Sequence, residues 1–242
     1  MQLSKLPWSK LLAESVLIIV SVYFAIVLEG MSQDRAAKSA AHAALVQMLG
    51  DMKEDVAELE EVRAHQLALD KHYTALILWL EDPESMPLDA VGGAMDAVFM
   101  DNRTFFPRSS AWTTMVAEGQ LSILDAPNLV TQLGNFYESV NARLVEGGAQ
   151  FEYNLGDIGR NSATAIWDGF NRELMTTDAN KLIAFRNQLR YMHIFGSSWY
   201  LDRLHEYRLM LDSLVLDIES YLDESGFELE SSGLHGQSRE IQ

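Results

Sequence analysis

The feature that most constrains this chain is an apolar run from Leu11 to Leu28, whose polar members are Glu14 and two serines. At about 1.5 Å per residue, a helix over this run would be about 27 Å long, just enough to cross the hydrocarbon core of a bilayer. Lys5 and Lys10 precede the run. We therefore expect a membrane-spanning helix, with membrane lipid as its first partner.

Two other interpretations of the apolar run are open. A secretory signal peptide also combines a basic start with an apolar stretch, but it needs a small-x-small cleavage site directly afterwards. The nearest such site, Ala41-His42-Ala43, lies beyond several charged residues. A buried helix of a soluble protein is the third interpretation, although an apolar surface on all sides is unusual for one.

The anchor carries an acid that needs a physical explanation. Glu14 lies one turn from Lys10, so it can pair with that lysine or reach the headgroup region, and it can also contact another membrane helix. The candidate anchor and partner-helix contacts are Trp8, Glu14, Val20, Tyr23, Phe24 and Val27.

Basic residues flank the anchor almost equally, with Lys5 and Lys10 before it and Arg35 and Lys38 after it. A short basic start still favours an N-terminus inside the cell and a soluble domain outside the cytoplasmic membrane. The chain has no cysteine, which is compatible with export.

Composition limits the partners of the soluble part. The chain has 242 residues and a formal net charge of −17, and nearly half of its residues are apolar. This length and composition suffice for one sizeable core. Nucleic-acid binding is not expected, because affinity for phosphates depends on lysine and arginine.

The fold class expected is all-α, an N-terminal transmembrane helix followed by an elongated antiparallel helical bundle. Apolar residues recur at helical spacing throughout, and no strand alternation of useful length is present. The predicted organisation is a cytoplasmic N-terminus (1–10), an anchor (11–30), a helical stalk (31–44), an extracytoplasmic bundle (45–226) and a flexible acidic tail (227–242).

Breakers and caps predict the individual helices. A proline-free helix over 32–81 continues from the anchor and stops at the prolines of 82–87. Short helices are expected over 88–100 and from Ser109 or Ser110 to Gly119, separated by a loop over 101–108.

Two further long helices are expected. The first begins at Asp125-Ala-Pro127, with the acid as cap, and runs to about Met175, with glycines at 147–148, 156 and 159 that could bend or split it. The last begins after Thr177 or Asp178 and has a possible kink at Gly196-Ser197-Ser198.

Two segments of the chain resemble a known group. The anchor pattern consists of Glu14, Leu17-Ile18-Ile19, Ala25, Leu28 and Asp34, and a second segment runs from Ser110 through Trp112, Gly119 and Leu124 to Pro127 and Leu129. Together they resemble uncharacterised bacterial membrane-anchored proteins with one N-terminal span and a helical soluble part. That group usually has a tryptophan shortly after the span, where this chain has Met31. The resemblance implies a bacterial cytoplasmic membrane location and supplies no catalytic residues.

The sequence contains no strong catalytic signature. Cysteine nucleophiles are excluded, and neither a Gly-x-Ser-x-Gly elbow nor a phosphate-binding glycine loop is present. Asp202-x-x-His205 and Glu61 with His65 approximate the metal-binding pairs of helical bundles, but such spacings also arise by chance on solvated helix faces. No cofactor, metal or catalytic residue is therefore predicted.

An aromatic cluster is the candidate pocket or partner surface. Trp112, Phe136 and Tyr137 could line a small-molecule pocket, with Arg108 meeting an anion. The same rings could instead fill the end of a bundle, where connecting helices need bulky apolar groups.

Three functions follow as hypotheses. The favoured one is a non-enzymatic interaction or scaffold protein, an accessory subunit of a larger membrane complex, which binds an integral membrane protein or a second copy of itself. The alternative is an extracytoplasmic ligand-sensing bundle that acts through a partner. A metal-dependent enzyme is the third.

Overall fold

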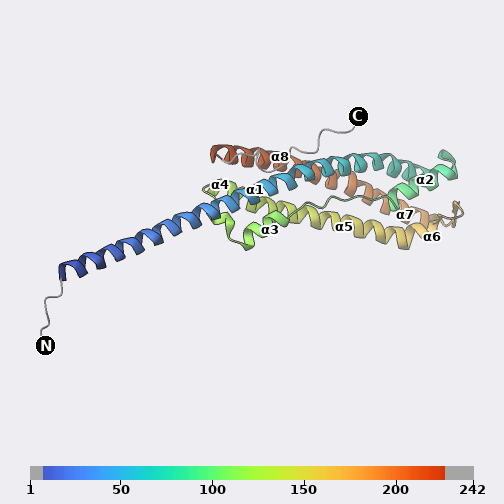
Figure 1. The fold of residues 1–242 in the computed structure, drawn as a ribbon. Helices are drawn as coiled ribbons and strands as arrows, with labels where there is room; N and C mark the ends of the chain where they lie inside the picture. Colours follow the sequence, from blue (N-terminus) through green and yellow to red (C-terminus); the bar gives the residue numbers. More distant parts are fainter. Residues whose placement is uncertain (1–7, 227–242) are drawn as a thin grey trace, which may run out of the picture.

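The computed structural model describes residues 8–226, and the predicted tail and most of the predicted cytoplasmic N-terminus lie outside this range. The protein is all-α apart from a two-residue-per-strand hairpin. Its longest element is α1 (Trp8–Glu81), one unbroken helix of 74 residues. At about 1.5 Å per residue, α1 is roughly 110 Å long. Its first third projects alone beyond the other helices (Figure 1).

Three long helical segments form the bundle. The first is the second half of α1. The middle segment consists of α4 (Pro127–Asn135), α5 (Ala142–Ile158) and α6 (Thr164–Ile166). Two π-helical turns join these helices, η3 (Phe136–Asn141) and η4 (Gly159–Ala163). The last comprises α7 (Ala179–Ile194), the π-helical turn η5 (Phe195–Tyr200) and α8 (Leu201–Glu224).

Short elements connect α1 to the middle segment. They are η1 (Pro83–Ser85), α2 (Leu88–Phe99), α3 (Ser110–Ala117) and η2 (Gln120–Ile123). Gly119 has a φ of 68°, a left-handed conformation that only glycine adopts without strain, so it ends α3 as predicted. The Asp82 side chain accepts a hydrogen bond from the Glu84 N–H, which marks the turn where α1 stops.

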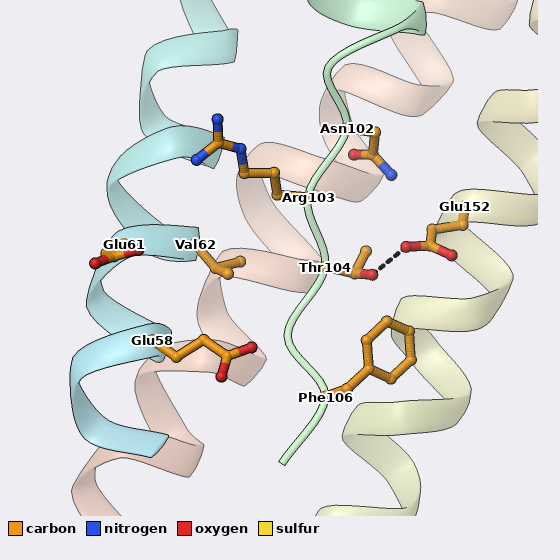
Figure 2. A pocket seen from close by; sticks show the side chains of 8 residues that line it. All are labelled: Glu58, Glu61, Val62, Asn102, Arg103, Thr104, Phe106 and Glu152. Atoms are coloured by element: carbon orange, nitrogen blue, oxygen red, sulfur yellow. Dashed lines mark hydrogen bonds between the residues drawn. The ribbon is translucent and has the colours of Figure 1, made fainter. Parts of the chain in front are cut away.

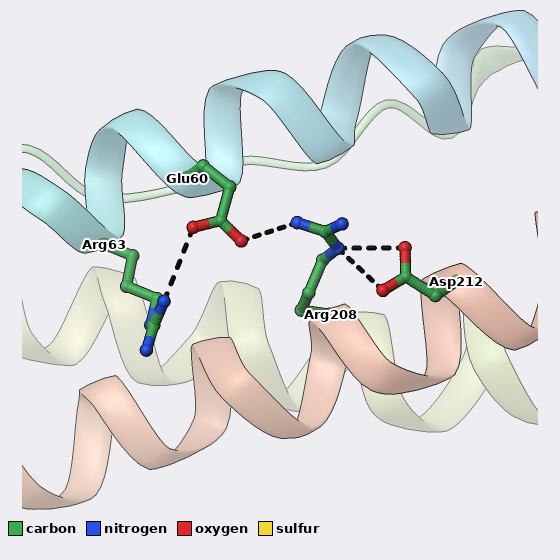
Figure 3. Close-up of polar contacts among 4 residues, drawn as sticks. All are labelled: Glu60, Arg63, Arg208 and Asp212. Atoms are coloured by element: carbon green, nitrogen blue, oxygen red, sulfur yellow. Dashed lines mark hydrogen bonds and ion pairs between the residues drawn. The ribbon is translucent and has the colours of Figure 1, made fainter.

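Polar pairs fix α1 antiparallel to the last segment. As residue numbers rise along α1 they fall along its partner, in the pairs Lys53–Glu219, Glu60–Arg208, Asp70–His193 and Glu81–Arg190. In the most extensive of these contacts, Arg208 donates to Glu60 at 2.5 Å and to both Asp212 oxygens at 2.9 and 3.0 Å (Figure 3). These side chains are partly exposed, so they contribute more to the register than to stability.

The core consists of two apolar clusters along the bundle. One lies nearer the projecting part of α1 and contains α1 residues from Ala41 to Val62 packed on α3, α4 and α8. The other lies towards the far end and contains α1 residues from Leu69 to Trp79 packed on α2, α5 and α7. Packing on α1 begins at Ala41, which is fully buried, four residues before the predicted start of the bundle.

Glycines permit close approach between the middle and last segments. The ring of Trp199 occupies the space in which a Gly147 side chain would stand, and a Cβ at Gly196 would meet the Phe151 ring at 3.1 Å. Gly147 and Gly148 lie within α5 and do not split it. The irregular turns occur instead at η3, η4 and η5, and η5 coincides with the kink predicted at 196–198.

Two sequence predictions about the middle segment are wrong. The helix ends at Ile166, not near Met175, because β1 (Trp167–Asp168) and β2 (Glu173–Leu174) form a hairpin. Phe170 lies in the turn of this hairpin and is 93% exposed. Asp125 does not cap α4: Ala126 holds that position, and Pro127 begins the helix.

The predicted cap of the last segment is confirmed. Asp178 accepts a hydrogen bond from the Asn180 N–H at 2.9 Å, which satisfies one of the free donors at the start of α7.

Candidate functional site

The first candidate site is the projecting part of α1. Over residues 14–28 every side chain is exposed, and the most apolar stretch of this helix has no buried residue. Val20, Tyr23, Phe24 and Val27 all lie in this stretch and are exposed. The helix therefore presents apolar surface on all sides, which a soluble helix rarely does. One candidate membrane span is thus present in the part of the chain that the structure describes.

The ends of the apolar stretch are only partly described. The side chains of Trp8 and of Lys10, one of the partners considered for Glu14, lie outside the described part of the chain. Glu14 itself is exposed and takes part in an interaction.

The second candidate site surrounds residues 101–109, a segment without regular structure that we call the strap. The strap passes between α1 and α5 (Figure 2). Because the strap makes no hydrogen bonds of a helix or sheet, its backbone N–H and C=O groups need partners elsewhere. Buried side chains supply them: Tyr200 accepts from the Phe105 N–H at 2.9 Å, and Gln66 donates to the Arg103 carbonyl at 2.6 Å.

A partly buried ion pair holds the C-terminal end of the strap to α1. Arg108 Nη1 donates to Asp55 Oδ1 at 2.6 Å, and the Arg108 backbone N–H donates to Asp55 Oδ2 at 3.0 Å. Glu54 and Glu58 lie within 3.3 Å of the same guanidinium. Arg108, predicted to meet an anion in a pocket, thus already has three carboxylates of its own chain around it.

Burial controls the protonation of Asp55. Only 2% of this residue is exposed, and loss of solvation raises the pKa of its carboxyl from 3.8 to about 6, although the Arg108 donors act in the opposite direction. Burial and nearby Glu54 also raise the pKa of Asp51. Desolvation changes the pKa of Asp55 more than its pairing with Arg108 does, because a carboxylate loses much hydration in a site that water does not reach.

The raised pKa of Asp55 predicts a pH dependence of stability. The folded state holds a proton that the unfolded state releases between pH 3.8 and about pH 6. Asp55 therefore contributes stability that is fully present below pH 3.8 and is lost as pH rises through 6, by up to about 3 kcal/mol. Urea unfolding of the full chain in mild detergent measures this slope. Asp55→Asn should remove it, and an unchanged slope would contradict the assignment.

The predicted aromatic residues come together at one place. Trp112 stacks on Tyr137 at 5.0 Å with nearly parallel rings, and Phe136 packs against Tyr137 and Tyr207 at 5.1 and 4.8 Å. Phe136 and Tyr207 are fully enclosed in the core and contribute packing. Burial and nearby Asp55 and Asp51 raise the pKa of Tyr137, which stays a neutral phenol.

A shallow groove of about 480 Å³ lies beside the stacked pair, and Trp112 and Tyr137 both line it. Arg108 does not line this groove and pairs with Asp55 instead. Asn141 also lines the groove, is buried, and has an Oδ1 without a hydrogen-bond partner among the described residues. The sequence signal for Asn141 is its place four residues after Tyr137, a polar side chain on the apolar face of the helix.

A larger open pocket of about 610 Å³ is lined in part by strap residues 102–104 and 106. Its walls include Glu58, Glu61 and Glu152, and Thr104 donates a hydrogen bond to Glu152 (Figure 2). The excess of carboxylates makes this pocket a poor site for an anion.

In the described part of the chain, the pairs with metal-like spacing form no common metal site. Glu61 lines the acidic pocket, whereas His65 hydrogen-bonds to the Asp101 carbonyl at 2.6 Å. Asp202 and His205 are exposed on α8. Among residues 8–226, no three histidine or acidic side chains are arranged to hold a metal ion.

The two candidate sites therefore differ in kind. The projecting helix can be solvated by lipid or by another apolar helix, whereas the strap and its neighbours form polar, carboxylate-rich surface. Comparison of the chain with protein-family models, curated proteins and solved structures finds no match.

Proposed function

We propose that this protein is a membrane-anchored, non-enzymatic interaction protein, an accessory subunit of a larger complex in the bacterial cytoplasmic membrane. One observation carries the proposal: the apolar part of α1 makes no buried contact within the chain, yet continues without a break into the core of the bundle. Its partner must therefore lie outside the chain. Lipid solvates such a surface, and a second membrane helix can cover one side of it.

The geometry of α1 supports an anchoring role. A single helix runs from the apolar segment through the exposed stretch before Ala41 and into the bundle, with no break at Gly30. A continuous helix transmits position and orientation better than a flexible linker. With the N-terminus inside, this helix would hold the bundle at a fixed distance outside the membrane.

Partner contacts in the membrane are proposed on the face formed by Val20, Tyr23, Phe24 and Val27. These residues share one side of the helix, because they are spaced by three, four and seven positions. All four are exposed in the structure. The β-branched valines at positions 20 and 27 have restricted χ1 rotamers, so they lose little side-chain entropy when a partner helix packs on them.

Gentle extraction tests the proposal. The full chain, affinity-tagged at the C-terminus, is extracted in mild detergent, and the co-purifying proteins are identified by mass spectrometry. We expect stoichiometric recovery of an integral membrane protein or of a second copy of this chain. Recovery of an isolated monomer, from membranes that contain the natural partners, would contradict the proposal.

Paired tryptophan variants locate the contact face. Val20→Trp with Val27→Trp keeps the segment apolar but obstructs close approach, and should abolish co-purification. Ile18→Trp with Val22→Trp alters the opposite side of the same helix and serves as the matched control, which should retain the partner. Equal effects of the two pairs would remove the assignment of this face.

A further inference from the structure

An apolar pocket of about 390 Å³ lies between α2, the η4 turn and the hairpin. These elements are at the end of the bundle away from the projecting part of α1, near the labels α2 and α6 in Figure 1. Ligand-binding pockets in proteins commonly have 300–1,000 Å³ and combine apolar walls with a few polar groups. This pocket is thus the right size for a small molecule.

Aromatic packing holds the pocket walls in place. Phe99 stacks on Phe185 with centroids 6.1 Å apart, and Trp167 packs edge-on against Trp79 at 6.2 Å. Phe99 approaches the η4 turn closely, since a Cβ at Gly159 would meet its ring at 3.3 Å. Walls supported in this way exist before a ligand arrives, which reduces the entropic cost of binding.

The acidic side chain beside the pocket is already paired. Asp96 lies 3.3 Å from Arg172, whose guanidinium also donates to the Asp89 carbonyl and lies against Gly92. Arg172 therefore offsets the negative charge on this wall.

Arg160 is the free cation of this pocket. It belongs to the η4 turn, is exposed, and makes no ion pair with the described residues. Its guanidinium lies beside Gly156, where a Cβ would stand 3.0 Å from Nη1, and both residues line the pocket. An unpaired arginine next to an apolar cavity is notable in a chain whose formal net charge is −17.

We infer that this pocket binds a small amphipathic carboxylate, with its apolar body against Met95, Phe99 and Ala163 and its carboxylate paired with Arg160. Arginine and a carboxylate form charge-assisted hydrogen bonds, frequently two in parallel. The pocket lies at the end of the bundle away from the proposed membrane segment, so the ligand reaches it from the aqueous phase. The inference concerns a second site and does not depend on the proposed role of the anchor.

Three probes of matched shape test the assignment: phenylbutyrate, phenylbutanol and phenylbutylamine. Binding to the full chain in mild detergent is measured by isothermal titration calorimetry, with titrations into detergent alone subtracted. The acid should bind most tightly, the alcohol about tenfold more weakly, and the amine least, because only the acid pairs with Arg160.

Three variants separate the charge from the cavity. Arg160→Gln should weaken phenylbutyrate binding about tenfold and leave phenylbutanol unchanged. Arg143→Gln removes another exposed arginine of the same helical segment and should change the affinity for neither probe. Thr164→Phe, at an exposed position of the pocket wall, should block both probes. Circular dichroism and the melting temperature establish that each variant is folded.

Several outcomes would overturn the inference. Equal affinity for the acid and the alcohol would remove the role of Arg160, as would an Arg160→Gln variant that binds like the unaltered protein. Preference for the amine would assign the pocket to a cation. Absence of binding by all three probes to folded protein, at concentrations up to about millimolar, would show that the cavity is not a ligand site.

Discussion

Replacing Ile18 and Val22 together by arginine is expected to release the protein from membranes into the soluble fraction. Both residues lie near the middle of the exposed apolar stretch, on one side of α1. An arginine at the centre of a membrane helix costs about 2.5–3.5 kcal/mol on insertion scales, so two cost roughly 5–7 kcal/mol. Carbonate extraction followed by centrifugation measures the change, with the unaltered chain remaining in the pellet.

The matched control uses two exposed leucines on the same helix. Leu67→Arg with Leu78→Arg introduces the same charges within the bundle part of α1, at positions exposed to a similar degree. This variant should stay in the membrane fraction. Extraction of the unaltered chain by carbonate would contradict membrane insertion, and so would retention of the Ile18/Val22 variant.

The second large effect is expected from Arg108→Ala. This substitution leaves Asp55 buried without its cation and removes the attachment of the strap to α1 through the arginine side chain. Removing one partner of a buried pair costs 3–5 kcal/mol. We expect about 3 kcal/mol, because the Arg108 side chain is 37% exposed and water replaces part of the interaction. Urea unfolding in mild detergent, followed by tryptophan fluorescence, measures the loss.

Further variants test whether this loss of stability comes from the unpaired charge of Asp55 or only from lost contacts of the Arg108 side chain. Asp55→Asn should change stability by about 1 kcal/mol or less at pH 8, since the amide avoids burying a charge but can accept only one of the two Arg108 hydrogen bonds. The double variant Asp55→Asn/Arg108→Ala should regain much of the stability lost in Arg108→Ala, because no unpaired charge remains. The Arg108→Ala penalty should also be smaller at pH 5 than at pH 8, where Asp55 must ionise. A penalty independent of pH, with purely additive variants, would contradict the buried-charge explanation.

Local sequence rules predicted the long helices well. The absence of proline between Ser32 and Glu81 and the helical spacing of apolar residues anticipated α1, and Gly119 and Asp178 marked the helix ends that the structure has. These signals act within one or two turns of chain, so a single sequence contains them.

The hairpin was missed because its cause is not local. Leu174 continues a helical pattern, yet the chain leaves the helix after Ile166 so that Trp167 can pack against Trp79 and Arg172 can cross α2 at Gly92. Arg172 adopts a φ of 53°, a left-handed conformation that sequence rules do not expect of arginine. Contacts between distant segments override helix propensity here.

In the candidate sites, too, the sequence predicted some contacts and missed others. Trp112 and Tyr137 were predicted to lie together and do stack, since bulky rings near the ends of short helices gather where a bundle needs filling. Arg108 was grouped with them but pairs with Asp55 instead. No spacing rule connects residues 53 positions apart, and that distance along the chain separates the two partners.

The sequence by itself determined that residues 11–28 are apolar on every side, that most of the rest is helical, and where most helices begin and end, because hydrophobicity and capping act over neighbouring residues. Only the tertiary structure decided which cations are neutralised and which stay free. It placed Arg108 on Asp55 and Arg172 on Asp96, and left Arg160 beside an apolar cavity. Pairing depends on distances of a few ångströms between segments far apart in the chain, and packing of the whole bundle sets those distances.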